Sequence, residues 1–224
     1  ALAQDVKLCV GAYRLDYSKG YLERFPAFER LLELEPRWIG QFSFVQCAEP
    51  PRVSIDEYQN LDTPVRAVAG RSNQRSGRPG CQPIVLRIEH HDAAQVYEMY
   101  RAADLCYVSS LHDGMNLVAK EFVAARDDEQ GVLVLSQFTG AARELAEALT
   151  INPYDIEQSA AALHIALTMS PEEQRARMRS MRNVVQEFNV YRWAGRMLLD
   201  AARMGHRSRV MARARDARRR AGGA

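Results

Sequence analysis

The stretch CYVSSLHDGMNLVAKE, residues 106–121, determines the fold that we expect. It begins inside an apolar run, residues 105–108, whose β-forming side chains predict a short buried strand. Asp113-Gly114 is a turn signal, and a helix is expected from Met115 onward. The apolar stripe of that helix is expected to contain Leu117, Val118, Phe122 and Ala125. The stretch therefore predicts a strand, a tight turn and a helix in direct succession.

This strand-turn-helix unit would suit an anionic ligand. The turn directs backbone N–H groups, and the positive end of the helix dipole, toward the space beyond the strand. Glu121 lies four residues after Leu117 on the same side of the helix, where its carboxylate could accept both hydroxyls of a ribose. An ordinary capped helix with a surface glutamate would use the same residues, so both interpretations stay open.

Similar apolar runs recur on both sides of this unit. Further strands are expected at 6–12, 42–48, 83–88, 132–135 and 149–151. Helices are expected at 22–34, from 54 onward with an interruption at Pro64, at 94–102, at 171–187 and at 191–204, and residues 71–80 are expected to form a loop. The alternation predicts an α/β fold, a parallel sheet with helices on both faces.

The composition is that of an ordinary globular chain. Its 224 residues carry a net charge of +2, with 47% hydrophobic and 26% charged residues. No apolar run reaches membrane length, so no membrane partner is expected. Residues 206–224 are rich in Arg, Ala and Gly and are expected to be a disordered tail; because the rest is nearly neutral, no nucleic-acid partner is expected. The cysteines lack C-x-x-C spacing and are expected to be buried free thiols in a reducing cytosol: Cys9, Cys47, Cys81 and Cys106.

Cationic side chains follow the expected strands. Arg14 and Lys19 fall between the first strand and the first helix, beside a Ser and a Gly. A guanidinium and an ammonium at the open end of a strand suit phosphate binding, and two solvated surface cations are the alternative that stays open. Arg52 follows the second strand, and His90-His91 follows the third. Adjacent side chains in an extended chain point opposite ways, so the two histidines do not predict a metal site.

The common nucleotide and nucleophile motifs are absent from the sequence. It contains neither G-x-G-x-x-G nor G-x-x-x-x-G-K-[ST], and no Ser/His/Asp or Cys/His arrangement. Gly140 lies among small residues after the fifth strand, and we interpret it as a tight turn rather than as a backbone approach to a ligand.

Three blocks of the sequence together resemble one family. They are RLDYSKG at 14–20, DGMNLVAKE at 113–121, and VLVLSQFTGAA at 132–142 with NPYD at 152–155. In residue type, order and spacing they resemble the trehalose-6-phosphate synthases, retaining glycosyltransferases of family 20. The resemblance covers roughly residues 6–200, and the block at 113–121 is its most specific part.

The resemblance implies the C-terminal, nucleotide-sugar half of a two-domain GT-B glycosyltransferase. Residues 1–205 would be a Rossmann-like nucleotide-sugar-binding domain, followed by the tail at 206–224. The implied reaction transfers glucose, with retention, from UDP-glucose to glucose-6-phosphate and gives trehalose-6-phosphate and UDP. No cofactor or metal is implied, because in a front-face mechanism the leaving phosphate itself takes the acceptor proton. The expected compartment is the cytoplasm, and assembly as a homo-oligomer stays open.

The resemblance also implies residue roles. Arg14, Lys19 and Asp113 would be catalytic, and the two cations would hold the diphosphate of UDP-glucose. Glu121 would hold the ribose, and Arg52 would reach the phosphate of glucose-6-phosphate. Uracil and the donor sugar would lie near the histidines. The full donor-binding set would be Arg14, Lys19, His90, His91, Asp113, Gly114, Met115, Asn116, Leu117, Val118 and Glu121.

The sequence departs from the family pattern at two places. Ala12-Tyr13 stand where the family usually has Val-Asp, and His112 stands where Arg is frequent. Because the sequence starts at Ala1 rather than at Met, we expect a fragment boundary there, with the acceptor half of the family pattern missing. We therefore expect the chain to bind donor but to transfer nothing alone. A non-catalytic nucleotide-sugar-binding or regulatory module, or a related transferase with a different acceptor, are the alternatives.

Overall fold

A computed structural model describes residues 6–49 and 61–221 of the chain. The chain divides into two units, Ala1–Val184 and Val185–Ala224, which are described separately here. This division falls within α7 (Pro171–Glu187), before the boundary expected at residue 205.

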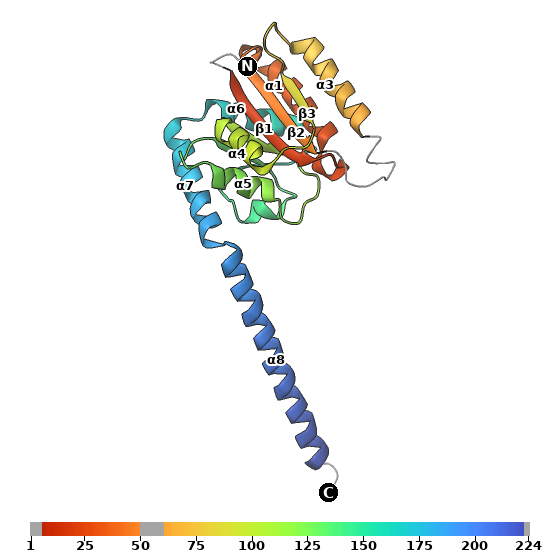
Figure 1. Ribbon diagram of the computed structural model, residues 1–224, viewed down its shortest axis with the longest axis vertical. Coiled ribbons are helices and arrows are strands. Elements are labelled where there is room, and N and C mark those ends of the chain that lie inside the picture. Colours follow the sequence, from red (N-terminus) through yellow and green to blue (C-terminus); the bar gives the residue numbers. More distant parts are fainter. Residues whose placement is uncertain (1–5, 50–60, 222–224) are drawn as a thin grey trace. The chain divides into compact units, whose positions relative to one another are not determined.

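Six parallel strands form the first unit's sheet in the order β3-β2-β1-β4-β5-β6 (Figure 1). The strands are β1 (Lys7–Arg14), β2 (Phe42–Glu49), β3 (Ile84–Ile88), β4 (Leu105–Val108), β5 (Val132–Ser136) and β6 (Leu149–Ile151). All five strand pairs are parallel, so the expected Rossmann-like α/β fold is confirmed. The order reverses between β1 and β4, which places a crevice at their carboxyl ends.

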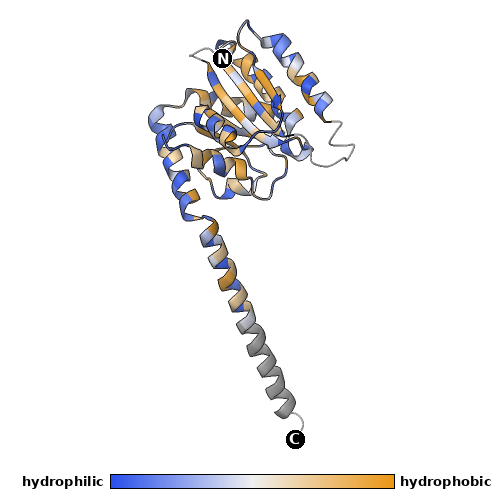
Figure 2. Ribbon diagram, viewed as in Figure 1, coloured by the Kyte–Doolittle hydropathy of each residue, from blue (hydrophilic) through white to orange (hydrophobic). Residues whose placement is uncertain are grey.

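Helices cover both faces of the sheet. α1 (Tyr21–Leu34) packs against α3 (Asp62–Ser76) and α6 (Ile156–Thr168) on one face. On the other face, α4 (Ala93–Ala102) packs against α5 (Leu117–Ala125) (Figure 1). Figure 2 shows that the strands are mainly hydrophobic, whereas α3 is mainly hydrophilic. This distribution is typical of a sheet that is buried under amphipathic helices.

The core beneath α1 is aromatic. Phe28 stacks on Phe44 with ring centroids 4.3 Å apart, and it meets Tyr107 edge-on at 5.2 Å. These rings are completely buried and join α1 to β2 and β4. Aromatic pairs in this geometry add to the stabilisation from burial. This packing against β2 and β4 therefore fixes the position of α1 and of the loop that precedes it.

Two expectations about the helices are wrong. α3 continues to Ser76, although residues 71–80 were expected to form a loop, because Asn73 binds Ile84 through both its amide atoms and ties the helix to β3. α5 begins at Leu117 rather than at Met115, and its buried face carries Ala119, Phe122, Val123 and Ala125. Leu117 is 58% exposed, so it does not belong to the apolar stripe. The helix start expected near residue 54 lies outside the described residues.

The four cysteines are free and buried, as expected. Burial raises the pKa of each thiol, to about 11 for Cys47, so all four stay protonated at neutral pH. In the parts of the chain that the structure describes, no helix is long and apolar enough to cross a membrane.

The second unit contains the end of α7 and α8 (Val190–Ala221). Residues 206–221 belong to this helix, which differs from the disordered tail that the composition favoured. Ala and Arg are among the strongest helix formers, so a segment that is poor in apolar residues can still be helical.

Candidate functional site

A cavity of about 660 Å³ opens at the carboxyl ends of β1 and β4, where the strand order reverses. Most of the predicted site residues line it: Arg14, Lys19, His91, Asp113, Met115, Asn116, Leu117, Val118 and Glu121. Gly114 lies in the turn between two of these residues, whereas His90 lines a different cavity. Arg52 lies outside the described residues. The structure thus brings together groups that are about a hundred positions apart in the sequence.

The loop after β1 carries the two cations. Arg14 is the last residue of β1 and is exposed, and Lys19 ends a short 3-10 turn, η1 (Tyr17–Lys19). The Asp16 carboxylate begins this turn by accepting a hydrogen bond from the Ser18 N–H at 2.8 Å. Gly20 ends it with φ of 66°, a left-handed conformation that favours glycine. The local sequence therefore fixes the backbone position from which the Lys19 side chain extends.

Lys19 and Asp113 form an ion pair across the cavity wall. The Lys19 Nζ donates to Asp113 Oδ2 at 2.7 Å, and the two side chains are only 21% and 16% exposed. The carboxylate also accepts hydrogen bonds from the backbone N–H groups of Met115 (3.3 Å) and Asn116 (3.1 Å). Because an ammonium has three donor hydrogens, Lys19 can bind a phosphate oxygen while it keeps this partner.

Burial disfavours the charged form of Asp113, but its partners outweigh that effect. The hydrogen bond and charge of Lys19 act first, and the Met115 N–H and the Asn116 side chain add to them. Together they hold the pKa of Asp113 below its ordinary value of 3.8. The carboxylate is therefore ionised at neutral pH.

The lowered pKa of Asp113 makes a testable contribution to stability. A depressed carboxylate pKa stabilises the folded state above the unfolded pKa, and this contribution is lost as pH falls through the folded pKa. We expect the free energy of unfolding of the wild type to exceed that of Asp113→Asn by a constant amount from about pH 7 to about pH 5, and by less below about pH 4. Urea unfolding of both proteins across this range measures the difference. A difference that already shrinks between about pH 6 and about pH 5 would contradict the depressed pKa.

Asn116 forms the start of α5 and also contacts the ion pair. It has φ of 73°, and its side-chain oxygen accepts a hydrogen bond from the Ala119 N–H at 2.9 Å. Its side-chain nitrogen donates to Asp113 Oδ2 at 3.1 Å. The N–H groups of Leu117 and Val118, in the first turn of α5, have no carbonyl of their own helix to bind. They are the backbone donors that the helix offers to an anion in the cavity.

Glu121 lies one turn further along α5. Its Oε2 accepts a hydrogen bond of 3.5 Å from the hydroxyl of Tyr100, which comes from α4 and also lines the cavity. Burial raises the pKa of Tyr100, so this hydroxyl remains a donor. The second carboxylate oxygen of Glu121 is available to a ligand hydroxyl in this geometry.

Hydrogen bonds from the loop after β5 hold the Asp113-Gly114 turn in place. The Asp113 N–H donates to the carbonyl of Phe138, and the Gly140 N–H donates to that of Asp113 at 2.9 Å. A Cβ at Gly140 would lie 2.1 Å from the carbonyl oxygen of Gly114. Gly140 therefore allows two loops to approach each other, and it begins a short 3-10 turn, η3 (Gly140–Arg143).

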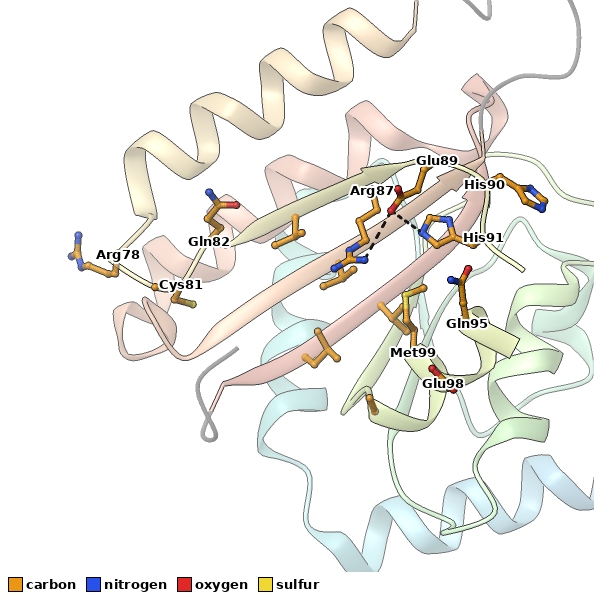
Figure 3. Close-up of a pocket in the computed structure, with 16 residues that line it drawn as sticks. Arg78, Cys81, Gln82, Arg87, Glu89, His90, His91, Gln95, Glu98 and Met99 are labelled. Carbon is orange, nitrogen blue, oxygen red and sulfur yellow. Dashed lines mark ion pairs between the residues drawn. The ribbon is translucent and has the colours of Figure 1, made fainter. Parts of the chain in front are cut away.

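Both histidines border a second, larger cavity, but only His91 also lines the first one. His91 is buried at the edge of the first cavity, and its Nε2 lies 3.6 Å from a carboxylate oxygen of Glu89. His90 is 83% exposed and borders a second cavity of about 970 Å³ on the sheet face near α4 (Figure 3). Within the described residues, no group of three or more His, Cys, Asp or Glu could hold a metal ion.

Sequence reasoning did not assign two of the tyrosines that line the cavity, Tyr13 and Tyr100, to the site. Tyr100 belongs to the buried side of α4, where an apolar pattern predicts only core. Tyr13 lines the cavity at a position where the family pattern has an acid, and only that departure drew attention to it. The other departure, His112, is exposed and does not line the cavity.

Comparison with known proteins agrees with this geometry. The family model described as glycosyltransferase family 20 matches residues 1–203. The chain belongs to glycosyltransferase family 20. A trehalose-6-phosphate synthase of Klebsiella pneumoniae subsp. pneumoniae is 43% identical over 206 residues, which are 92% of this chain and 44% of the relative.

Solved structures of other family 20 members have the same fold. A UDP-forming trehalose-phosphate synthase of Burkholderia xenovorans in complex with glucose-6-phosphate is 43% identical, with a TM-score of 0.85 over 88% of this chain and 44% of that chain. A structure from E. coli bound with UDP-2-fluoro glucose is 42% identical, with a TM-score of 0.85 and the same coverage. The chain thus spans less than half the length of these family 20 proteins.

Proposed function

We propose that this chain is the donor-binding half of a trehalose-6-phosphate synthase and that its cavity holds UDP-glucose. The observation that carries the proposal is the Lys19–Asp113 pair, which fixes an ammonium beside Arg14 at the point where the strand order reverses. An open α/β sheet binds nucleotides at this point. Membership of family 20 supports glucose as the sugar and UDP as the carrier.

In this proposal the diphosphate lies against Arg14, Lys19 and the first turn of α5. When the bond between the anomeric carbon and the phosphate oxygen breaks, negative charge develops on the leaving phosphate. Fixed cations and N–H dipoles at that position stabilise the developing charge without reorganisation. The acceptor oxygen then bonds to the anomeric carbon on the same face, and its proton passes to the leaving phosphate oxygen, so the configuration is retained.

The remaining roles follow from the same placement. Glu121 would accept the ribose hydroxyls, and His91 would lie toward the base and the donor sugar. Glucose-6-phosphate would be the acceptor, bound largely by the half of the protein that this chain does not contain, with Arg52 at its phosphate. The proposal requires no cofactor or metal and places the protein in the cytoplasm. It leaves assembly as a homo-oligomer open.

Calorimetric titration of the chain with UDP and with UDP-glucose, without added metal, tests the proposal. We expect saturable binding of both, since the diphosphate and ribose contacts are common to the two ligands. Inosine at the same concentration, which lacks phosphate, is the control and should bind far more weakly. Absence of binding to both nucleotides would contradict the proposal.

The ribose role of Glu121 can be tested separately. We expect Glu121→Gln to weaken binding of UDP by about 1.5–3 kcal/mol, the range for hydrogen bonds to a charged group, and to leave the binding of inorganic diphosphate unchanged. Only UDP carries the ribose. Glu98→Gln on the exposed side of α4 is the matched control, and it should bind both ligands like the wild type. Equal losses for UDP and diphosphate would exclude the ribose role.

A further inference from the structure

Arg24 is a completely buried arginine directly behind the phosphate-binding loop. It lies in the first turns of α1, four residues after Gly20, and its side chain has no exposed surface. It does not line the cavity, so a ligand cannot touch it. In the sequence it is indistinguishable from the surface arginines of an amphipathic helix.

The guanidinium of Arg24 joins three segments of the fold. Its Nη2 donates to the carbonyl oxygen of Lys19 at 2.5 Å, and its Nε donates to that of Gly20 at 3.2 Å. The same Nε donates to the hydroxyl of Ser109, just beyond β4, at 2.9 Å. On β2, Nη1 binds the side-chain oxygen of Gln46. Arg24 therefore ties the loop of Lys19 to both neighbours of β1.

The surrounding residues are shaped to hold this guanidinium. A Cβ at Gly11 would lie 2.9 Å from the side-chain oxygen of Gln46 and 3.2 Å from Arg24 Nη1, so glycine leaves the space that the pair occupies. The rings of Tyr13 and Tyr21 lie 5.2 Å and 4.8 Å from the guanidinium carbon, within cation–π range. The Tyr21 hydroxyl donates to the carbonyl of Arg14 at 3.3 Å, so the same helix turn holds both cationic residues.

The charge of Arg24 has no carboxylate partner among the described residues, since its hydrogen bonds all end on neutral oxygens. Burying a charge in this way costs free energy, and an apolar side chain of similar size often fills such a site with no loss of stability. Its field reaches the cavity wall: burial raises the pKa of Tyr13, and the charge of Arg24 opposes that rise. A dianionic ligand beyond the loop would benefit from this charge.

We propose that Arg24 is a positioning residue for the diphosphate: it holds the carbonyls of Lys19 and Gly20, and so places the Lys19 ammonium at the leaving phosphate. The inference rests on the proposed donor site. It predicts that loss of Arg24 weakens the binding of ligands that carry phosphate and leaves the binding of the nucleoside alone nearly unchanged.

The test compares Arg24→Gln, Arg24→Lys and Arg126→Gln with the wild-type chain. Arg126 is the control, because it is also buried and donates to the backbone carbonyls of Tyr100 and Arg101 at 2.9 Å and 3.0 Å; unlike Arg24, it also pairs with a carboxylate, Asp128, at 2.8 Å. UDP and inorganic diphosphate are titrated by calorimetry, uridine is titrated by ligand-observed NMR, and thermal unfolding is recorded for each variant. All titrations are made well below the unfolding midpoint.

We expect Arg24→Gln to bind UDP and diphosphate about tenfold or more weakly, with uridine changed less than about twofold. Arg24→Lys keeps the charge but cannot hold two carbonyls at once, so its loss for UDP should be intermediate. Arg126→Gln should lower the unfolding temperature and leave UDP affinity within about twofold of wild type.

Two results would overturn the inference. One is UDP affinity within about twofold of wild type in Arg24→Gln, and the other is an equal loss for UDP and uridine, which would indicate a purely structural role. If Arg24→Gln does not fold, the same two criteria apply to Arg24→Lys. A wild-type chain that does not bind UDP would instead remove the proposed function, and with it this inference.

Discussion

Lys19→Ala is expected to weaken UDP binding by about 3 kcal/mol, the upper end of the range for hydrogen bonds to charged groups. The substitution removes the ammonium and also leaves the Asp113 carboxylate, now without its cation, facing the phosphates. Arg14→Ala should weaken UDP binding less, by about 1 kcal/mol, because Arg14 is exposed and water screens its interaction with the phosphates. Calorimetric titration of UDP measures both losses.

Lys7→Ala is the matched control for Lys19→Ala. Lys7 is the first residue of β1 and forms an ion pair of the same length, 2.7 Å, with Asp104, at the amino ends of β1 and β4 and so away from the cavity. Its removal should leave UDP affinity unchanged. A similar loss in Lys7→Ala and Lys19→Ala would mean that net charge, and not position, governs binding, and unchanged affinity in Lys19→Ala would remove the phosphate assignment.

Gly20→Ala should have the largest effect on stability of the substitutions considered. Its φ of 66° is left-handed, and a Cβ would lie 2.4 Å from the backbone oxygen of Ser109, which cannot move independently of β4. We expect a loss of about 2–5 kcal/mol in the free energy of unfolding, from about 1–2 for the backbone conformation and about 1–3 for overpacking. Urea unfolding measures it, and UDP affinity should fall as well, because Lys19 precedes the glycine.

Gly80→Ala separates the two parts of that loss. Gly80 has a comparable φ of 82°, but a Cβ there would meet no atom within 4 Å. Only the backbone cost of about 1–2 kcal/mol is expected, with UDP affinity unchanged. If Gly80→Ala and Gly20→Ala lower the free energy of unfolding equally, the close contact with Ser109 does not contribute to the loss.

Local patterns were sufficient to predict the sheet but not the helix ends. The strands expected at residues 105–108 and 149–151 are β4 and β6 to the residue, since apolar β-formers between turn signals define short buried strands. The end of α3 was missed because Asn73, which reads as a loop former, bonds across to β3. Leu117 reads as core by spacing, yet it faces the cavity mouth, where a ligand rather than a helix would cover it.

The sequence was sufficient to predict site residues that directly follow strands. It was not sufficient to predict contacts between residues that are far apart in the chain. Arg14, Lys19 and Glu121 were identified from their places relative to strands and helices, and the cavity contains all three. No pattern indicates that Lys19 pairs with Asp113, because that contact depends on β1 lying beside β4. The burial of Arg24 was equally invisible, since the sequence does not reveal which side of a helix arginine turns inward.

The pairing of β1 with β4 also determines when the site forms during folding. Lys19 and Asp113 are separated by 94 positions, and Asp113 is held by the loop that follows β5. Closing so long a segment is entropically costly and slow compared with local helix formation. A nascent chain that ends before β5 would contain every residue that lines the cavity, but not the loop after β5 whose hydrogen bonds hold Asp113 in place. We therefore expect the proposed nucleotide binding to begin late in folding, so its onset in a refolding experiment should report when the two halves of the sheet have joined.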